Sequence, residues 1–183
     1  MEQIKVTITG VPPGLLFHRL SPEMEEKMSR ARNNATREEI ERNNCHLYIY
    51  YNSEGRPSIP SIWLINSLKQ AAAEVKIPGR GKKTYKNLVG AGFILIQPDM
   101  IPLESDGWTI YAAPVVVQRA RIIRHRPLFP QWRAMFTIIF DEQHFTQKLI
   151  EELLQYAGAF VGIGDYRPQR GGPFGRFTTQ FNI

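Results

Sequence analysis

Residues 157–183 read AGAFVGIGDYRPQRGGPFGRFTTQFNI, and the organisation of the chain is clearest from this end. Five glycines and three arginines fall between Gly162 and Arg176. The segment before them has the apolar spacing of a helix. Phe177, Thr179 and Phe181 after them share one face of an expected final strand. The glycine-rich stretch is therefore predicted to be a loop that joins the last helix to the last strand.

The composition of this glycine-rich loop suits an anionic ligand. Glycine permits positive φ and close backbone approach, and arginine carries a planar donor fork that matches phosphate or base edges. The alternative is a long β-connection whose glycines satisfy turns and whose arginines are only solvated. If the loop binds nucleic acid, its aromatic side chains can stack on bases. The predicted binding residues here are Gly162, Gly164, Tyr166, Arg167, Arg170, Gly171, Gly172, Phe174, Gly175 and Arg176.

The net charge of +6 is concentrated in two further stretches. Residues 69–86 contain six basic side chains and one acidic one, and residues 119–133 contain five arginines and no acid. Localised positive charge attracts polyanions, which makes nucleic acid the expected partner, with a solvated basic face as the alternative. The candidate phosphate contacts in these stretches are Arg80, Lys82, Lys83, Lys86, Arg119, Arg121, Arg124 and Arg126.

Length and composition predict a single domain over residues 1–183. The chain is 43% hydrophobic and 22% charged, enough for one substantial core. It lacks an apolar run long enough to span a membrane, and its N-terminus lacks a signal-peptide pattern. We expect a cytoplasmic protein, from a bacterium or a phage-infected host cell, that makes no membrane contact. Its single cysteine, Cys45, cannot form an internal disulfide.

The elements are predicted from periodicity. Residues 4–9 alternate as a strand, and residues 15–57 are an expected charged helical insertion that contains a strand over residues 47–51. After Pro60, the side chains Ile62, Trp63, Ile65 and Leu68 are spaced as one apolar face of a core helix.

The second half of the chain is predicted to be rich in strands. Short strands are expected at residues 93–96 and 108–111, and residues 114–123 and 132–140 are predicted to form a wide hairpin. A helix is expected from residue 141 to Gly158. Without the insertion, the order is βαββαβ, which predicts an α+β, ferredoxin-like core: an antiparallel sheet with two helices on one face.

This element order, with its glycine-rich loop before the last strand, resembles the RAMP superfamily, the RNA-binding proteins of CRISPR effector complexes. The match is nearest to their backbone subunits, which also have a helix like that of residues 59–73. The resemblance implies sequence-independent RNA binding through the RNA backbone, a thumb-like insertion, and subunits that assemble along the strand as a homo-oligomer or a larger ribonucleoprotein. The C-terminal stretch is also similar to phage proteins that end in a GIGDxRPxxGGPFGRF-like string.

Three functions remain open. The first is non-catalytic binding of single-stranded RNA or DNA, with RNA favoured by the resemblance. The second is a phage-encoded assembly or host-interference module that binds an acidic protein partner. The third is a metal-independent ribonuclease, because some RAMP nucleases use histidine as a general acid or base. His125, between two arginines, is the weak candidate for a catalytic residue, and a surface histidine at a basic hairpin tip is the commoner explanation. No HExxH, CxxC or P-loop string is present, so neither a metal nor another cofactor is expected.

Overall fold

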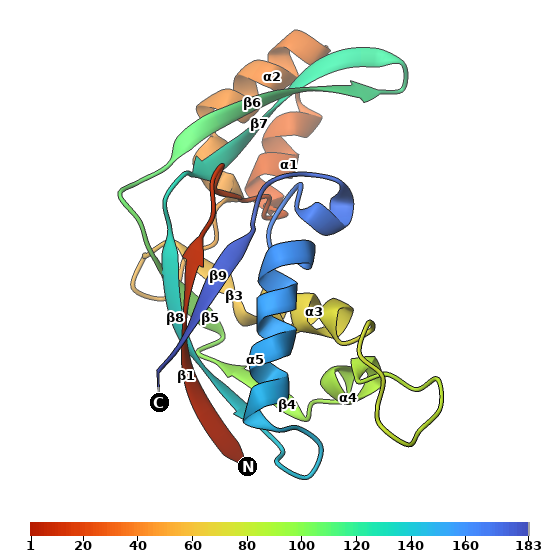
Figure 1. Cartoon of the computed structure of the whole chain (residues 1–183). Helices are drawn as coiled ribbons and strands as arrows, with labels where there is room; N and C mark the ends of the chain where they lie inside the picture. Colours follow the sequence, from red (N-terminus) through yellow and green to blue (C-terminus); the bar gives the residue numbers. More distant parts are fainter. Residues whose placement is uncertain (183) are drawn as a thin grey trace.

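The computed structural model describes residues 1–182, and its centre is an antiparallel sheet with the strand order β3-β5-β8-β1-β9 (Figure 1). A further strand, β4, pairs with β8 beyond the end of β5. The strands are β1 (Glu2–Gly10), β3 (Ser58–Pro60), β4 (Ile94–Gln97), β5 (Met100–Glu104), β8 (Arg133–Phe140) and β9 (Phe177–Asn182).

Two helices, α3 (Ser61–Ala71) and α5 (Gln147–Tyr156), cover one face of this sheet. Every second residue of the central strands points toward them: Ile4, Val6 and Ile8 of β1 are buried, whereas Lys5 and Thr9 lie on the open face. The order β9-β1-β8-β4/β5 around two helices is that of a ferredoxin-like βαββαβ core. The predicted α+β fold class is confirmed.

The buried stripe of α3 differs from the predicted one. Leu64, Leu68 and Ala71 face the core, whereas Ile62 is 54% exposed and Trp63 is only partly buried. The predicted stripe mixed residues from two faces of the helix. The side of α3 that carries Trp63 is therefore only partly covered by the core and can line a second surface of the protein.

The α5 helix begins and ends later than predicted. Thr146 is its N-cap, with Oγ1 accepting from the amide of Leu149 at 3.2 Å, whereas Asp141 closes a turn with the amide of Gln143. The helix then continues past Gly158 as a π-helical turn, Ala157–Val161. It ends at Gly162, which has a φ of +73° and is the first residue of the glycine-rich loop.

The predicted hairpin between residues 114–123 and residues 132–140 is wrong. The second core strand is formed by β4 and β5, which pair with β8 and bury Ile94, Ile96 and Leu103. Residues 124–131, predicted as the hairpin loop, lie mainly in strand β7 (Ala120–Phe129). The apolar residues of β4 and β5 alternate as in a core strand. Because both strands are short, the sequence pattern predicted additions to the sheet here instead of the second core strand.

Residues 109–129 form a separate hairpin inserted between the second and third core strands. Strand β6 (Thr109–Val117) pairs with β7 throughout, and the short β2 (Leu15–Leu16) pairs with the end of β7. The turn lies at Gln118 and Arg119, which have φ values of 48° and 67°. Figure 1 shows this hairpin projecting from the sheet, with helices packed against it.

Those helices are α1 (Pro22–Ser29) and α2 (Asn34–Asn43) from the predicted insertion. The side chain of Ser21 caps α1, and that of Asn33 caps α2. Residues 47–51 are not a strand, because the 3-10 helix η1 (Cys45–Tyr48) ends within them and only Tyr51 forms an isolated β-bridge, to Pro57. Phe17 and Ile49 are fully buried in the main core, so both ends of the 15–57 segment are anchored there.

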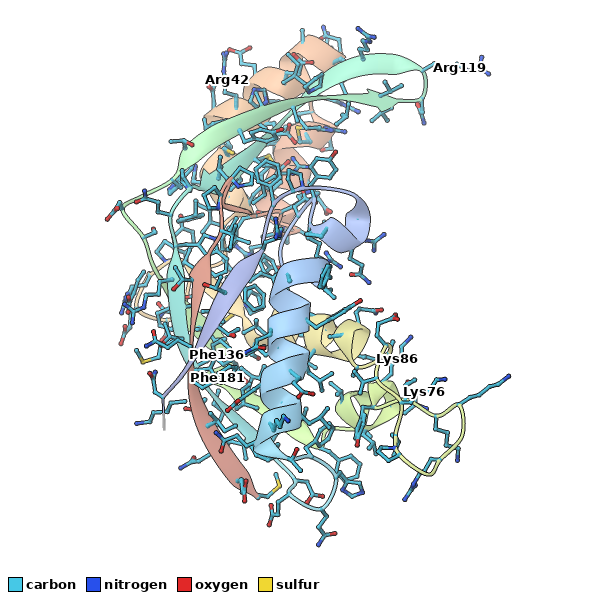
Figure 2. The ribbon with its side chains drawn as sticks, in the orientation of Figure 1. Arg42, Lys76, Lys86, Arg119, Phe136 and Phe181 are labelled. Atoms are coloured by element: carbon cyan, nitrogen blue, oxygen red, sulfur yellow. The ribbon has the colours of Figure 1, made fainter. Side chains whose placement is uncertain are left out.

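A short helix, α4 (Lys86–Gly90), follows the basic loop after α3. Figure 2 places Phe136 and Phe181 in the layer between the sheet and α5, and Arg119 at the far tip of the hairpin. None of the helices within residues 1–182 has the length and apolar composition required to cross a membrane.

Candidate nucleic-acid interface

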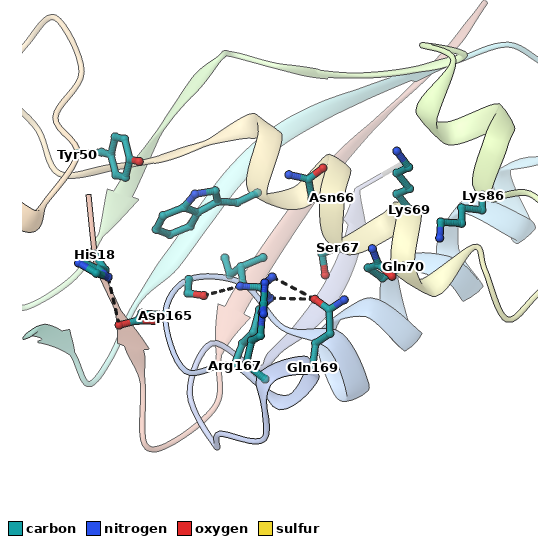
Figure 3. Close-up of a pocket in the computed structure, with 14 residues that line it drawn as sticks. His18, Tyr50, Asn66, Ser67, Lys69, Gln70, Lys86, Asp165, Arg167 and Gln169 are labelled. Carbon is teal, nitrogen blue, oxygen red and sulfur yellow. Dashed lines mark hydrogen bonds and ion pairs between the residues drawn. The ribbon is translucent and has the colours of Figure 1, made fainter. Parts of the chain in front are cut away.

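A cleft of about 520 Å³ lies between α3 and the glycine-rich loop (Figure 3). One wall is a helical stripe, formed by Trp63, Asn66, Ser67 and Gln70 at spacings of three, four and seven residues. This spacing places all four side chains on one side of α3, adjacent to its core-facing side. The opposite wall is the start of the loop, which is held to α3 by the Ser67 hydroxyl donating to the carbonyl of Gly162 at 3.0 Å.

Four cationic side chains line this cleft: Lys69, Lys86, Arg167 and Arg170. None of the salt bridges formed among residues 1–182 includes any of them. Burial lowers the pKa of Arg167, and the nearby charge of Arg170 lowers it further. Arginine nevertheless stays protonated in proteins, so four like charges gather at this cleft. The carboxylate that also lines the cleft, Asp165, partly offsets the shift of Arg167 but forms its ion pair with Arg126.

Arg167 is held in a fixed orientation. Its Nη1 donates to the carbonyl of Gly164 at 3.0 Å, and its Nε and Nη2 both donate to Oε1 of Gln169 at 3.2 and 3.1 Å (Figure 3). A guanidinium held by two neutral partners keeps its full charge and has free donors left for an anion.

The aromatic end of the cleft is formed by Tyr50, Trp63 and His18. The Trp63 ring packs on Phe17 with centroids 5.3 Å apart and meets Tyr50 edge-on at 5.5 Å. These contacts fix the indole beside the cations, an arrangement that suits a base stacked next to its phosphate.

Most glycines of the loop are required by close backbone packing. A Cβ on Gly175 would lie 1.7 Å from the carbonyl oxygen of Ile163, and one on Gly172 would lie 1.9 Å from that of Tyr166. Gly164 has φ +77°, and a Cβ there would lie 2.6 Å from the carbonyl oxygen of Leu16. Gly171 differs, because its φ of +79° ends a 3-10 turn and the space around it is open.

The backbone amides of the loop are largely used within the protein. Ile163 donates to the carbonyl of Gly175, Gly172 to that of Arg167, and Gly175 to that of Gly14. The loop is therefore a folded support that presents side chains, and its amides do not form an open cradle for phosphate. Any anion at this loop would be bound mainly by arginine side chains.

Two of the predicted contacts are engaged elsewhere. Arg126 is only 13% exposed, and it pairs with Glu41 at 2.9 Å and Asp165 at 3.1 Å. Phe174 is 3% exposed and packs against Tyr111 and Tyr166. The sequence could not show that the ion-pair partner of Arg126 lies 85 residues away on α2. These two side chains support the site, and Tyr166, at 48% exposure, remains the accessible aromatic residue of the loop.

The predicted position of His125 at a hairpin tip is also wrong. His125 lies within β7 and is 8% exposed, and its Nδ1 is 3.7 Å from Oε2 of Glu41, beyond hydrogen-bonding distance. His18 is the histidine that lines the cleft. Its Nδ1 lies 3.8 Å from Asp165 Oδ2, and burial followed by the charge of Arg126 lowers its pKa.

The remaining candidates lie on separate projections. Arg119 and Arg121 are exposed near the β6–β7 tip, with Arg124 farther down β7 near Glu41, and Arg80, Lys82 and Lys83 are exposed in the loop between α3 and α4. Arg176 is exposed after the glycine-rich loop, with Nε donating to the carbonyl of Ala159 at 3.3 Å. In Figure 1 the hairpin tip, the glycine-rich loop and the 76–84 loop all project on the helix-covered side of the sheet.

Most of the α3 wall lies outside the residues predicted from the sequence. Asn66 and Gln70 are not among the predicted binding residues, and Trp63 is predicted on the core-facing stripe of the helix. The available signal was the second, polar stripe of α3, whose three- and four-residue spacing matches a second helical face. The stripe indicates a binding wall only together with the glycine-rich loop, which packs against α3 in the tertiary structure.

No protein-family model and no curated protein matches the sequence. Among solved structures, the fold is similar to a chain of the Type III-B Cmr-beta complex bound to cognate target RNA. The TM-score is 0.52 and the identity 10%, and the similarity covers 98% of this chain and 61% of that one. At this identity the similarity shows the fold alone. The chain therefore shares its α+β fold with a chain of an RNA-bound complex and spans less than two thirds of that chain's length.

Proposed function

We propose that this protein binds single-stranded nucleic acid, with RNA favoured, and that the cleft between α3 and the glycine-rich loop is the central contact. The observation that carries the proposal is the cluster of Lys69, Lys86, Arg167 and Arg170 around the cleft, none with a carboxylate partner within residues 1–182. Such a cluster attracts an external anion, and Trp63 beside it supplies a stacking surface. The RNA-bound state of the structural neighbour is consistent with this proposal.

The outlying basic projections extend the proposed contact. None of Arg119, Arg121, Arg80, Lys82 and Lys83 lines the cleft; they are exposed on the β6–β7 tip and in the loop between α3 and α4, where they could meet phosphates of a longer strand. We therefore expect affinity to increase with strand length, and several copies to assemble on a long RNA. Mass photometry of the protein with and without a long single strand tests this assembly.

Binding is expected to weaken steeply with salt. On single strands each phosphate contact contributes about 0.7 to the slope of log affinity against log salt. Replacing Arg167 and Arg170 together with alanine should lower that slope by about 1.4 and weaken binding to all sequences at low salt. Fluorescence anisotropy with labelled single- and double-stranded RNA and DNA at several salt concentrations measures both effects.

The matched control for that double variant is Lys5→Ala with Arg133→Ala. These two cations lie on the open face of the sheet, opposite the helices, so the change in net charge is identical but remote from the cleft. Equal losses in the two double variants would show that charge alone matters and that the cleft has no special role. If wild type binds no nucleic acid at low salt, the proposal fails and an acidic protein partner becomes the better explanation.

Metal-independent RNA cleavage is a second candidate function, favoured by the position of His18. The depressed pKa keeps its imidazole neutral at neutral pH, as a general base requires, and the cations of the cleft are next to it. Under this hypothesis a single-stranded RNA is cut without added metal, and His18→Ala abolishes cutting. His125→Ala removes no side chain of the cleft, because His125 is buried in β7. An RNA that stays intact during long incubation with wild-type protein excludes the cleavage hypothesis.

A further inference from the structure

We infer that the cleft reads the base of one unpaired nucleotide, so that binding there is selective and not only a contact with the RNA backbone. This inference rests on the proposed function. It concerns the α3 wall, where Trp63, Asn66 and Gln70 lie on one side of the helix. A base needs a surface to stack on and polar groups at its edge, and this wall provides both.

The two α3 amides are free to meet a base. No hydrogen bond formed within residues 1–182 uses the side chain of Asn66 or Gln70, whereas Gln169 across the cleft is occupied by Arg167. A carboxamide carries a donor and an acceptor side by side, which is the pattern required for paired hydrogen bonds to an adenine edge. Figure 3 shows Asn66 and Gln70 on the helix above Arg167 and Gln169.

The opposite wall supplies the phosphate contact. Arg167 is fixed by Gly164 and Gln169, and Arg170 follows one helical turn later on the same loop. A nucleotide with its base against α3 and its phosphate against the loop therefore has one favoured orientation. The volume of about 520 Å³ lies in the range of small-molecule sites and is sufficient for a single nucleotide.

The floor beneath the base is rigid. Trp63 is held by Phe17, with ring centroids 5.3 Å apart, and by Tyr50, with centroids 5.5 Å apart. A pre-formed aromatic surface loses little side-chain entropy when a base stacks on it. Among residues 1–182 the structure thus combines, in one cleft, a fixed stacking surface, two free amides and four cations that form no salt bridge.

The test compares binding of A12, C12 and U12 RNA to wild type and to Asn66→Ala with Gln70→Ala. Wild type is expected to prefer one homopolymer, with A12 tightest, by about ten-fold, in the range of one good amide–base pair. The double variant should bind all three at about the affinity of the weakest. Gln3→Ala with Gln180→Ala, which removes two amides from the open sheet face, should keep the preference.

A second measurement does not depend on oligonucleotides. Adenosine monophosphate should quench part of the tryptophan fluorescence saturably, and Trp63→Phe should lose this quenching, because the other two tryptophans, Trp108 and Trp132, do not line the cleft. Equal affinities for the three homopolymers, or a preference that survives loss of both amides, overturn the inference while leaving nucleic-acid binding intact. Failure of every strand to bind at low salt instead removes the proposed function itself.

Discussion

Replacing Glu41 with alanine is expected to lower the free energy of unfolding by about 3–5 kcal/mol, the range for breaking a buried ion pair from one side. The Glu41 side chain is 1% exposed and lies 2.9 Å from Nη1 of Arg126. It also accepts hydrogen bonds from the Tyr48 hydroxyl and the His125 amide, both at 2.7 Å. Without the carboxylate, two buried donors lose their partner, and the buried Arg126 guanidinium keeps only the partly exposed Asp165 as a charged partner.

Chemical denaturation of the variants measures this effect. Glu39→Ala is the matched control, because it removes an exposed carboxylate from the same helix. Glu41→Gln should fall between the two, since an amide oxygen retains hydrogen bonds but not the charge. If Glu41→Ala is no less stable than Glu39→Ala, the ion-pair network does not hold α2 to the β6–β7 hairpin.

The second large effect is expected at Gly175, where alanine should lower the free energy of unfolding by about 4 kcal/mol or more, at the exceptional end for a single substitution. Its φ is +75°, and the new Cβ would overlap the carbonyl oxygen of Ile163. Gly175 cannot move away, since its amide donates to Gly14 at 2.8 Å and its carbonyl accepts from Ile163 at 3.0 Å.

Gly171→Ala is the control that separates backbone strain from lack of space. Gly171 lies in the same loop with nearly the same φ, +79°, but a Cβ there meets nothing within 4 Å. Its substitution should cost about 1–2 kcal/mol, the strain of a left-handed residue alone. Similar denaturation midpoints for the two variants would contradict the close packing of the loop at Gly175.

Periodic patterns in the sequence predicted the core elements of the fold except the second core strand, which β4 and β5 form. The alternation of β1 places Ile4, Val6 and Ile8 in the core because one face of that strand is buried. The βαββαβ order followed from such patterns, and the fold class was confirmed. The approximate extents of α3 and α5 could also be predicted, although cap chemistry at Thr146 moved the start of α5.

Strand pairing could not be predicted in the same way. Residues 114–123 have strong β-propensity, which favoured them as a core strand over the short β4 and β5. Pairing depends on which partner offers a complementary buried face, and β8 offers it to Ile94, Ile96 and Leu103. A local pattern identifies a strand without specifying its neighbour.

The amino-acid sequence by itself determined the α+β core, the glycine-rich loop before the last strand, and the concentration of positive charge. Tertiary structure alone decided which charged groups remain available. Arg126 and Arg167 look alike in the sequence, yet Arg126 meets Glu41 from α2, whereas Arg167 faces a cleft with no carboxylate partner within residues 1–182. The physical reason is that an ion pair forms between side chains adjacent in space, and long-range packing of α2, α3 and the loop sets that adjacency.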